Sequence, residues 1–123
     1  MYELTVSEEF CAAHAIVVGG QREPVHGHNW RVGVTVSGRH LDAEGLLCDF
    51  HALEEVVRTV VAPFMNADLN AVAPFDRMNP TAEHVARHIA DRVAAALPSG
   101  VAVTCVSVTE APGCVAAYRP DTP

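Results

Sequence analysis

HGHNWRVGVTVSG, which occupies residues 26–38, is the stretch that decides the fold. From His26 to Val36 every second position holds a histidine, tryptophan or valine, and smaller or more polar residues lie between them. A period of two is typical of a β-strand, because successive side chains of a strand point to opposite faces. Residues 2–14 alternate in the same way. The sequence therefore predicts two long strands that pair with each other and bury one face.

Three histidines fall on the same face of these two predicted strands. His26 and His28 are two residues apart, so their rings leave the strand on one side, with backbones roughly 6–7 Å apart. His14 lies on the same face of the first strand as Phe10, and it supplies a third ring if the strands are neighbours. An H-x-H pair alone is also compatible with ordinary packing, whereas three histidines around an open fourth position are typical of catalytic Zn²⁺ sites. The pattern favours a metal site at these three residues.

A second histidine pair lies further along the chain. His84 and His88 are four residues apart on a predicted helix, a spacing that also allows two rings to chelate a metal. The pair lies off the apolar stripe of that helix and close to Arg87 and Asp91. We therefore interpret it as part of a solvated polar face.

The middle of the chain changes period and predicts two helices. Asp49 caps the first helix, which ends at or before Pro63, and Thr81 caps the second. The expected buried stripes are Phe50, Leu53, Val57 and Val60 in the first helix, and Val85, Ile89, Val93 and Leu97 in the second.

The remaining segments complete the predicted topology. Residues 15–25 contain two glycines and a proline and predict an irregular loop. Residues 101–110 and 115–119 predict two further strands. The order of strand, strand, helix, helix, strand, strand predicts an α+β fold, in which a four-stranded antiparallel sheet carries both helices on one face.

Length and charge limit the functions open to the chain. Its 123 residues contain eight Lys and Arg against fifteen Asp and Glu, a net charge of -7. This is the size of one domain over residues 1–123, and an acidic surface disfavours nucleic acid and membrane surfaces as partners. The N-terminus has no signal-peptide pattern, so we expect a cytoplasmic protein. An apolar sheet with open edges predicts closure against other copies, and therefore an oligomer.

Five motifs occur in an order that is more specific than any one of them: Phe10-x-Ala12-Ala13-His14, His26-Gly27-His28-Asn29-Trp30, Asp49-Phe50, Asn79-Pro80-Thr81-Ala82-Glu83 and Val106-x-Val108-x-Glu110. In these motifs the chain resembles the 6-pyruvoyl-tetrahydropterin synthase and 6-carboxy-tetrahydropterin synthase family over nearly its whole length. The resemblance implies the tunnelling fold (T-fold), whose subunits join their sheets into a β-barrel, as a trimer or as a hexamer built from two trimers.

The resemblance also implies roles for individual residues. His14, His26 and His28 would hold zinc. Glu110, helped by Thr81, would bind the guanidine-like edge of a pterin-like substrate. This role is chemically reasonable, because a carboxylate can accept two parallel hydrogen bonds from adjacent N–H donors.

The chain departs from the family at its proton relay. Arg22 stands where family members have a Cys four residues before the first His of H-G-H, and Met65 and Asn66 stand where they have Asp and His. Glu23 and Asp68 are the candidate substitute bases. We expect a zinc-dependent enzyme with altered chemistry on a dihydropterin side chain, of the lyase or aldolase kind or of the epimerase kind. The alternatives are a catalytically silent protein that binds zinc and a pterin or purine, and a scaffold that binds neither.

Overall fold

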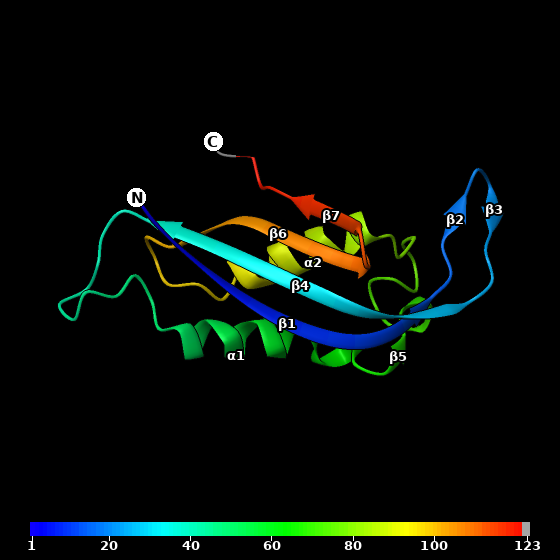
Figure 1. Ribbon diagram of the computed structural model, residues 1–123, viewed down its shortest axis with the longest axis horizontal. Helices are drawn as coiled ribbons and strands as arrows, with labels where there is room; N and C mark the ends of the chain where they lie inside the picture. Colours follow the sequence, from blue (N-terminus) through cyan, green and yellow to red (C-terminus); the bar gives the residue numbers. More distant parts are fainter. Residues whose placement is uncertain (122–123) are drawn as a thin grey trace.

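Two long antiparallel strands are the central feature of the computed structural model, which describes residues 1–121 (Figure 1). They are β1 (Tyr2–His14) and β4 (His26–Gly38), and they pair without interruption from Tyr2 opposite Gly38 to His14 opposite His26. The predicted pair of strands is confirmed. Because the register is unbroken, the alternating side chains of both strands lie on matching faces.

The sheet has five strands in the order β5-β1-β4-β6-β7. The added strands are β6 (Ala102–Ala111), β7 (Cys114–Tyr118) and the two-residue β5 (Ala67–Asp68). The prediction of four strands, all antiparallel, was therefore wrong in one respect, since β5 is a fifth strand and runs parallel to β1. Its pairing begins where the Asn66 N–H donates to the Cys11 carbonyl at 2.6 Å, a contact between residues far apart in the sequence.

The predicted loop between the long strands also contains regular structure. β2 (Val17–Val18) and β3 (Gln21–Arg22) form a small antiparallel hairpin beyond the end of the main sheet (Figure 1). Gly19 and Gly20 connect them with positive φ angles of 59° and 81°, a conformation that glycine adopts without strain.

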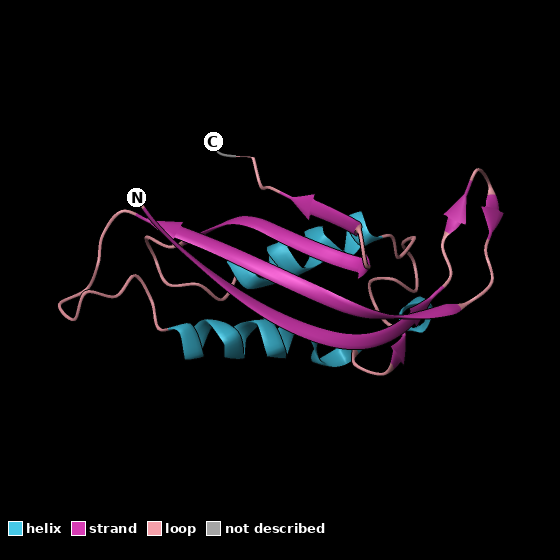
Figure 2. Ribbon diagram, viewed as in Figure 1, coloured by secondary structure: helices cyan, strands magenta, loops and turns pink. Residues whose placement is uncertain are grey.

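Both helices lie on one face of the sheet, as predicted (Figure 2). They are α1 (Phe50–Val61), capped by Asp49, and α2 (Ala82–Ala94), capped by Thr81. Two short 3₁₀ turns, η1 (Ala62–Phe64) and η2 (Leu69–Ala71), flank β5.

The buried stripe of α1 differs from the prediction. Leu53, Val57 and Val61 are buried, but Phe50 is 51% exposed. Phe50 is the first residue of the helix, where no neighbouring turn covers it. In α2 the predicted stripe holds through Val93, and Leu97 lies beyond the end of the helix.

The core lies between the helices and the sheet. Trp30 is fully buried, its ring stacks on Phe10 with centroids 6.0 Å apart, and its indole N–H donates to the Ala12 carbonyl at 3.1 Å. This bond satisfies the one polar group of a large apolar side chain, as burial of a tryptophan requires. The Trp30 ring also contacts His14 and His28, with centroids 4.9 and 5.7 Å away, so the core extends up to the histidines at the end of the sheet.

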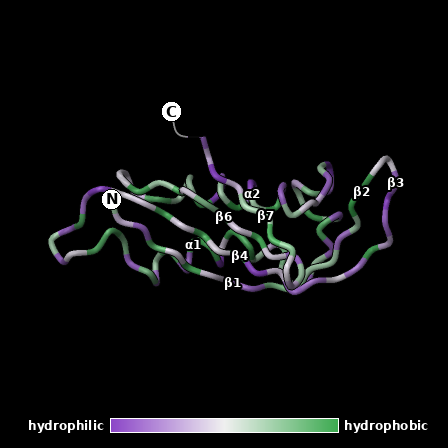
Figure 3. Tube along the Cα trace, turned by 45° about the horizontal axis from the view of Figure 1, so that its top comes forward, coloured by the Kyte–Doolittle hydropathy of each residue, from purple (hydrophilic) through white to green (hydrophobic). Residues whose placement is uncertain are grey.

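The opposite face of the sheet is polar along its two long strands, which corrects the expectation of an apolar sheet. Thr5 and Thr35 share a hydrogen bond of 2.8 Å there, and Arg31 pairs with Glu9. Figure 3 colours each residue by its hydropathy. The strand β6 is mainly hydrophobic (green), whereas β1 carries more hydrophilic residues (purple). Among residues 1–121, no helix is long and apolar enough to span a bilayer.

Candidate metal centre

Three histidines converge where β1 ends and β4 begins. The ligand nitrogens of His14, His26 and His28 all lie within 4.8 Å of one another, and the ring centroids are 4.7–5.1 Å apart. The unbroken register produces this cluster, because His14 lies opposite His26 and His28 follows two residues later on the same face. The structure thus brings together the three predicted ligands.

Backbone carbonyls orient two of the three rings. His14 Nδ1 lies 2.8 Å from the Pro80 carbonyl oxygen, and His26 Nδ1 lies 2.9 Å from that of Pro24. A carbonyl oxygen only accepts, so each Nδ1 must donate its hydrogen, which leaves Nε2 of the neutral ring with a free lone pair. Such bonds commonly fix the orientation of histidines that bind metals.

The Nε2 atoms of two of the three histidines are buried without a hydrogen bond. Nε2 of His14 and Nε2 of His28 are buried and form no hydrogen bond with any residue of the described chain. Burial is the largest influence on His28 and lowers its pKa; the Glu110 carboxylate raises it, and His14 and His26 lower it. A neutral imidazole is the form that binds a metal. Three converging rings, two of which have buried Nε2 atoms without a hydrogen bond, fit a divalent ion such as Zn²⁺.

Glu110 lies at the same centre. Its Oε1 atom is 3.0 Å from His14 Nε2 and 3.8 Å from His28 Nε2, and neither contact is a hydrogen bond. The side chain also lines two adjoining hollows. One, of about 510 Å³, is lined by His28 and Arg31 among others, and the other, of about 470 Å³, is lined by Glu83 and β7. The family resemblance implies that Glu110 binds the guanidine-like edge of a pterin. It does not predict this contact with the histidines.

Glu23, a predicted base, also reaches the centre. Its Oε1 lies 3.6 Å from His26 Nε2 and accepts a hydrogen bond of 3.2 Å from the Ile16 N–H. The side chain is about one-third exposed, so solvent or a ligand can still reach it. A carboxylate thus lies beside the most exposed of the three histidines.

Two other predicted site residues have structural contacts. Thr81 accepts a hydrogen bond of 3.1 Å from the His84 N–H as the cap of α2, and it directly follows Pro80, which holds His14. Asp68 accepts a bond of 3.0 Å from the Asn70 N–H and lies on β5, across β1 from the strand that carries His26 and His28.

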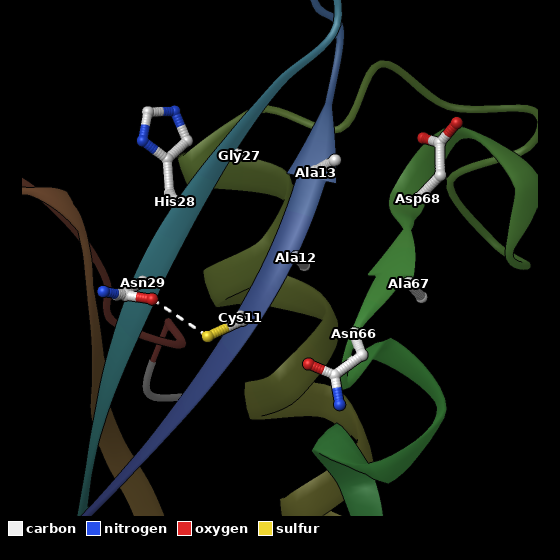
Figure 4. Close-up of a pocket in the computed structure, with 9 residues that line it drawn as sticks. All are labelled: Cys11, Ala12, Ala13, Gly27, His28, Asn29, Asn66, Ala67 and Asp68. Carbon is white, nitrogen blue, oxygen red and sulfur yellow. Dashed lines mark hydrogen bonds between the residues drawn. The ribbon is translucent and has the colours of Figure 1, made fainter.

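Figure 4 shows how the relay region lies relative to the histidines. The His28 ring projects from β4 away from Asn66 and Asp68, which belong to the opposite wall of a shallow hollow of about 550 Å³. Asn66 has a positive φ of 57°. Within one subunit, the structure does not bring Asp68 to the three histidines.

The second histidine pair does not converge. His84 is exposed, and its Nδ1 bonds to the Asn79 carbonyl at 2.7 Å, in agreement with a polar face. For His88 that interpretation was wrong, because its ring packs against Phe64 and Phe75 with centroids 5.6 and 5.5 Å away. Both phenylalanines come from the segment between the helices, so the sequence of α2 held no signal of them.

Comparisons with known proteins agree with the fold and the motifs. The sequence model of a family described as 6-pyruvoyl tetrahydropterin synthase matches residues 3–121. The 6-carboxy-5,6,7,8-tetrahydropterin synthase of Bacillus subtilis is 35% identical over 97% of this chain and 86% of its own length. A dihydroneopterin monophosphate aldolase of Pyrococcus furiosus is 34% identical over 82% of each chain.

Solved structures share the fold at lower identity. The 6-pyruvoyl tetrahydropterin synthase of Caenorhabditis elegans superposes with a TM-score of 0.84 at 20% identity, over 98% of this chain and 96% of that one. A Plasmodium vivax 6-pyruvoyltetrahydropterin synthase, in which a catalytic glutamate is mutated to alanine, has a TM-score of 0.78 at 19% identity over 98% of both chains. From the family match and the two curated relatives together, the chain belongs to the 6-pyruvoyl tetrahydropterin synthase family of pterin-processing enzymes.

Proposed function

We propose that this protein is a zinc-dependent enzyme that cleaves or rearranges the side chain of a dihydropterin, by lyase chemistry of the aldolase kind or by epimerisation. The observation that carries the proposal is the convergence of three imidazoles, two of which (His14 and His28) have buried Nε2 atoms that form no hydrogen bond, with the Glu23 carboxylate beside the third. His14, His26 and His28 would hold the ion. Zinc supplies Lewis acidity that polarises an oxygen of the bound side chain.

Glu23 is our candidate for the base. The chain has Arg22 at the position of the family cysteine, so another group must move the proton. Glu23 Oε1 lies 3.6 Å from His26 Nε2, next to the place where the side chain of a substrate would meet the three histidines. The catalytic residue named for the P. vivax structure is also a glutamate.

Asp68 is the second candidate base. It lies on β5 at the edge of the sheet, and the His28 ring of the same subunit projects away from it (Figure 4). Its position therefore suits a role toward the site of a neighbouring subunit.

The proposed step needs no oxidant. Glu23 takes the proton of the side-chain hydroxyl, the carbon–carbon bond beside it breaks, and an aldehyde leaves. The electron pair of that bond passes into the conjugated pterin ring, and the remaining side-chain carbon then takes a proton. Re-addition of the aldehyde from its other face would give the epimer, so both reactions share one deprotonation. A positioned base of this kind contributes about 10²–10⁴-fold to a rate.

Glu110 and Thr81 are our candidates for substrate binding. Glu110 lies between the histidines and the hollow that Glu83 also lines, so a ring seated there would meet two carboxylates. Carboxylates accept paired hydrogen bonds from the amino and ring N–H groups of a pterin. Thr81 caps α2 next to the same hollow, since its neighbour Ala82 lines it.

Assembly into a trimer, or a hexamer of two trimers, is part of the proposal. The sheet is open in one subunit, with β7 at one edge and only two residues of β5 paired along the other. Strand edges with unpaired N–H and C=O groups are favourable places for pairing with other chains. Closure into a barrel would bring Asp68 toward another subunit.

Two alternatives to an enzyme are a binding protein without catalytic activity and a scaffold without ligands. A protein that binds zinc and a pterin or purine without turnover would keep the histidines and Glu110 but leave Glu23 unused. A scaffold that binds neither would contain no zinc.

The test measures turnover of dihydroneopterin monophosphate and triphosphate by zinc-loaded protein, with light scattering on the same sample. We expect release of a two-carbon aldehyde or formation of an epimer, from a trimer or hexamer. Glu23→Gln should lower kcat by about 10²–10⁴-fold, whereas Glu44→Gln on an exposed loop should not. Zinc without turnover would favour the silent binder, absence of zinc would favour the scaffold, and a monomer would contradict the assembly.

A further inference from the structure

The three residues that follow His14 are each held by a different side chain. Asn70 binds both backbone groups of Ala15, accepting from its N–H at 2.8 Å and donating to its carbonyl at 2.9 Å. Asn79 does the same at Val17, at 2.9 and 3.0 Å. Between them, the Ile16 N–H donates to Glu23 Oε1 at 3.2 Å. Two asparagines from separate segments thus act as paired clamps on an extended backbone.

The hairpin beyond this segment has little else to fix it in place. Its strands are two residues each, Val17 and Val18 are 48% and 63% exposed, and two glycines form the turn. Hairpins of this size are not stable by themselves, and segments with few buried contacts open easily. The side-chain bonds to the backbone must therefore determine where the hairpin lies.

The position of Glu23 depends on the same hairpin. The Glu23 N–H donates to the Ile16 carbonyl at 3.0 Å, and its carboxylate accepts from the Ile16 N–H. Ile16 lies directly between the two clamped residues. Asn79 is also followed by Pro80, whose carbonyl orients His14. One short segment therefore connects the metal ligand, the hairpin and the candidate base.

We propose that Asn79 is a positioning residue, which holds the hairpin so that the Glu23 carboxylate stays beside His26. The inference rests on the proposed function, in which Glu23 is the base. Asn79 acts on the reaction through Val17 and Ile16 and does not contact the substrate. Asn70 performs the matching function at Ala15.

The first test is amide hydrogen exchange in zinc-loaded protein. In Asn79→Ala, the amides of Val17 and Glu23 should exchange about tenfold faster or more, as expected for loss of two hydrogen bonds, while Val34 in the sheet keeps its rate. Asn79→Asp keeps an acceptor for the Val17 N–H but cannot donate to its carbonyl, so its effect should be intermediate. Gln21→Ala, an exposed change within the hairpin, is the matched control and should leave exchange unchanged.

The second test is a kinetic double-mutant cycle. Asn79→Ala should lower kcat about tenfold with KM changed less than about twofold, and it should have no further effect in the Glu23→Gln background. Unchanged exchange at Val17 and Glu23 in Asn79→Ala would overturn the inference, and so would an equal loss of kcat in both backgrounds. An inactive wild-type protein would refute the proposed function, and the exchange measurement would still decide whether Asn79 holds the hairpin.

Discussion

His26 and His28 on β4 and His84 and His88 on α2 are two pairs whose spacings put both rings on one side of an element. The strand pair meets His14 across an unbroken register, and buried nitrogens without partners result. The helix pair has separate partners, because His84 bonds to the Asn79 carbonyl and His88 packs against Phe64 and Phe75. The difference shows that a shared face is only the first requirement for a metal site. The rings must also meet a third donor and have no other partner.

Removal of one ring from each pair should give the largest contrast. We expect about one Zn²⁺ per subunit in the wild-type protein, and essentially none in His26→Ala, because two remaining rings leave too few donors for a tetrahedral site. His84→Ala should keep the full zinc content. Elemental analysis of purified, dialysed protein measures both. Equal zinc loss in the two variants would disprove the assignment of the site to the strands.

Substitution of His88 and of His84 by alanine should affect the stability of the protein to different extents. His88→Ala should lower the free energy of unfolding by about 1–2 kcal/mol, because it removes a ring packed against two phenylalanines. His84 is exposed, so His84→Ala should change it by no more than about 0.5 kcal/mol. Denaturant unfolding of the zinc-loaded proteins gives both values. An equal change in the two variants would mean that the packing of His88 contributes little.

The smallest effect concerns pH. Burial is the main cause that lowers the pKa of His88, and Arg92 lowers it further against the raising effect of Asp91. Because the pKa is lower in the folded than in the unfolded chain, the neutral ring favours folding above the unfolded value of about 6.5, and this contribution is lost as pH falls below it. His88→Gln should therefore lose less Tm than the wild type between pH 7.5 and pH 5. Equal losses of Tm would show that His88 keeps an ordinary pKa.

The missing relay and the added carboxylates form a related contrast. By the family resemblance, Arg22, Met65 and Asn66 stand where relatives hold acid–base groups, whereas Glu23 lies 3.6 Å from a histidine nitrogen. The loss is implied by the family resemblance and needs only the sequence, since it concerns residue types at positions counted from the H-G-H and Leu69-Asn70 motifs. Glu23 is only three residues from His26, so their proximity is local in the sequence. Proximity of Glu110 to His14 and His28 required the folded chain, because it joins β6 to β1 and β4.

The sequence by itself determined the two long strands, the helices and the histidine face. These features depend on local periodicity, capping residues and proline positions, which act over a few residues. A period of two is enough to put His26 and His28 on one side, and the similar alternation of residues 2–14 places His14 correctly once the strands pair. The family motifs could also be found in the sequence, because each is a short run of residues.

Only the tertiary structure decided what surrounds those elements. It paired β5 with β1, clamped Ala15 and Val17 with Asn70 and Asn79, and packed His88 against two phenylalanines. It also left two histidine nitrogens buried without partners and brought Glu110 to them. Each of these features depends on how segments distant in the chain pack together. Its energy depends on geometry that no local pattern encodes, so periodicity located the site and packing determined its chemistry.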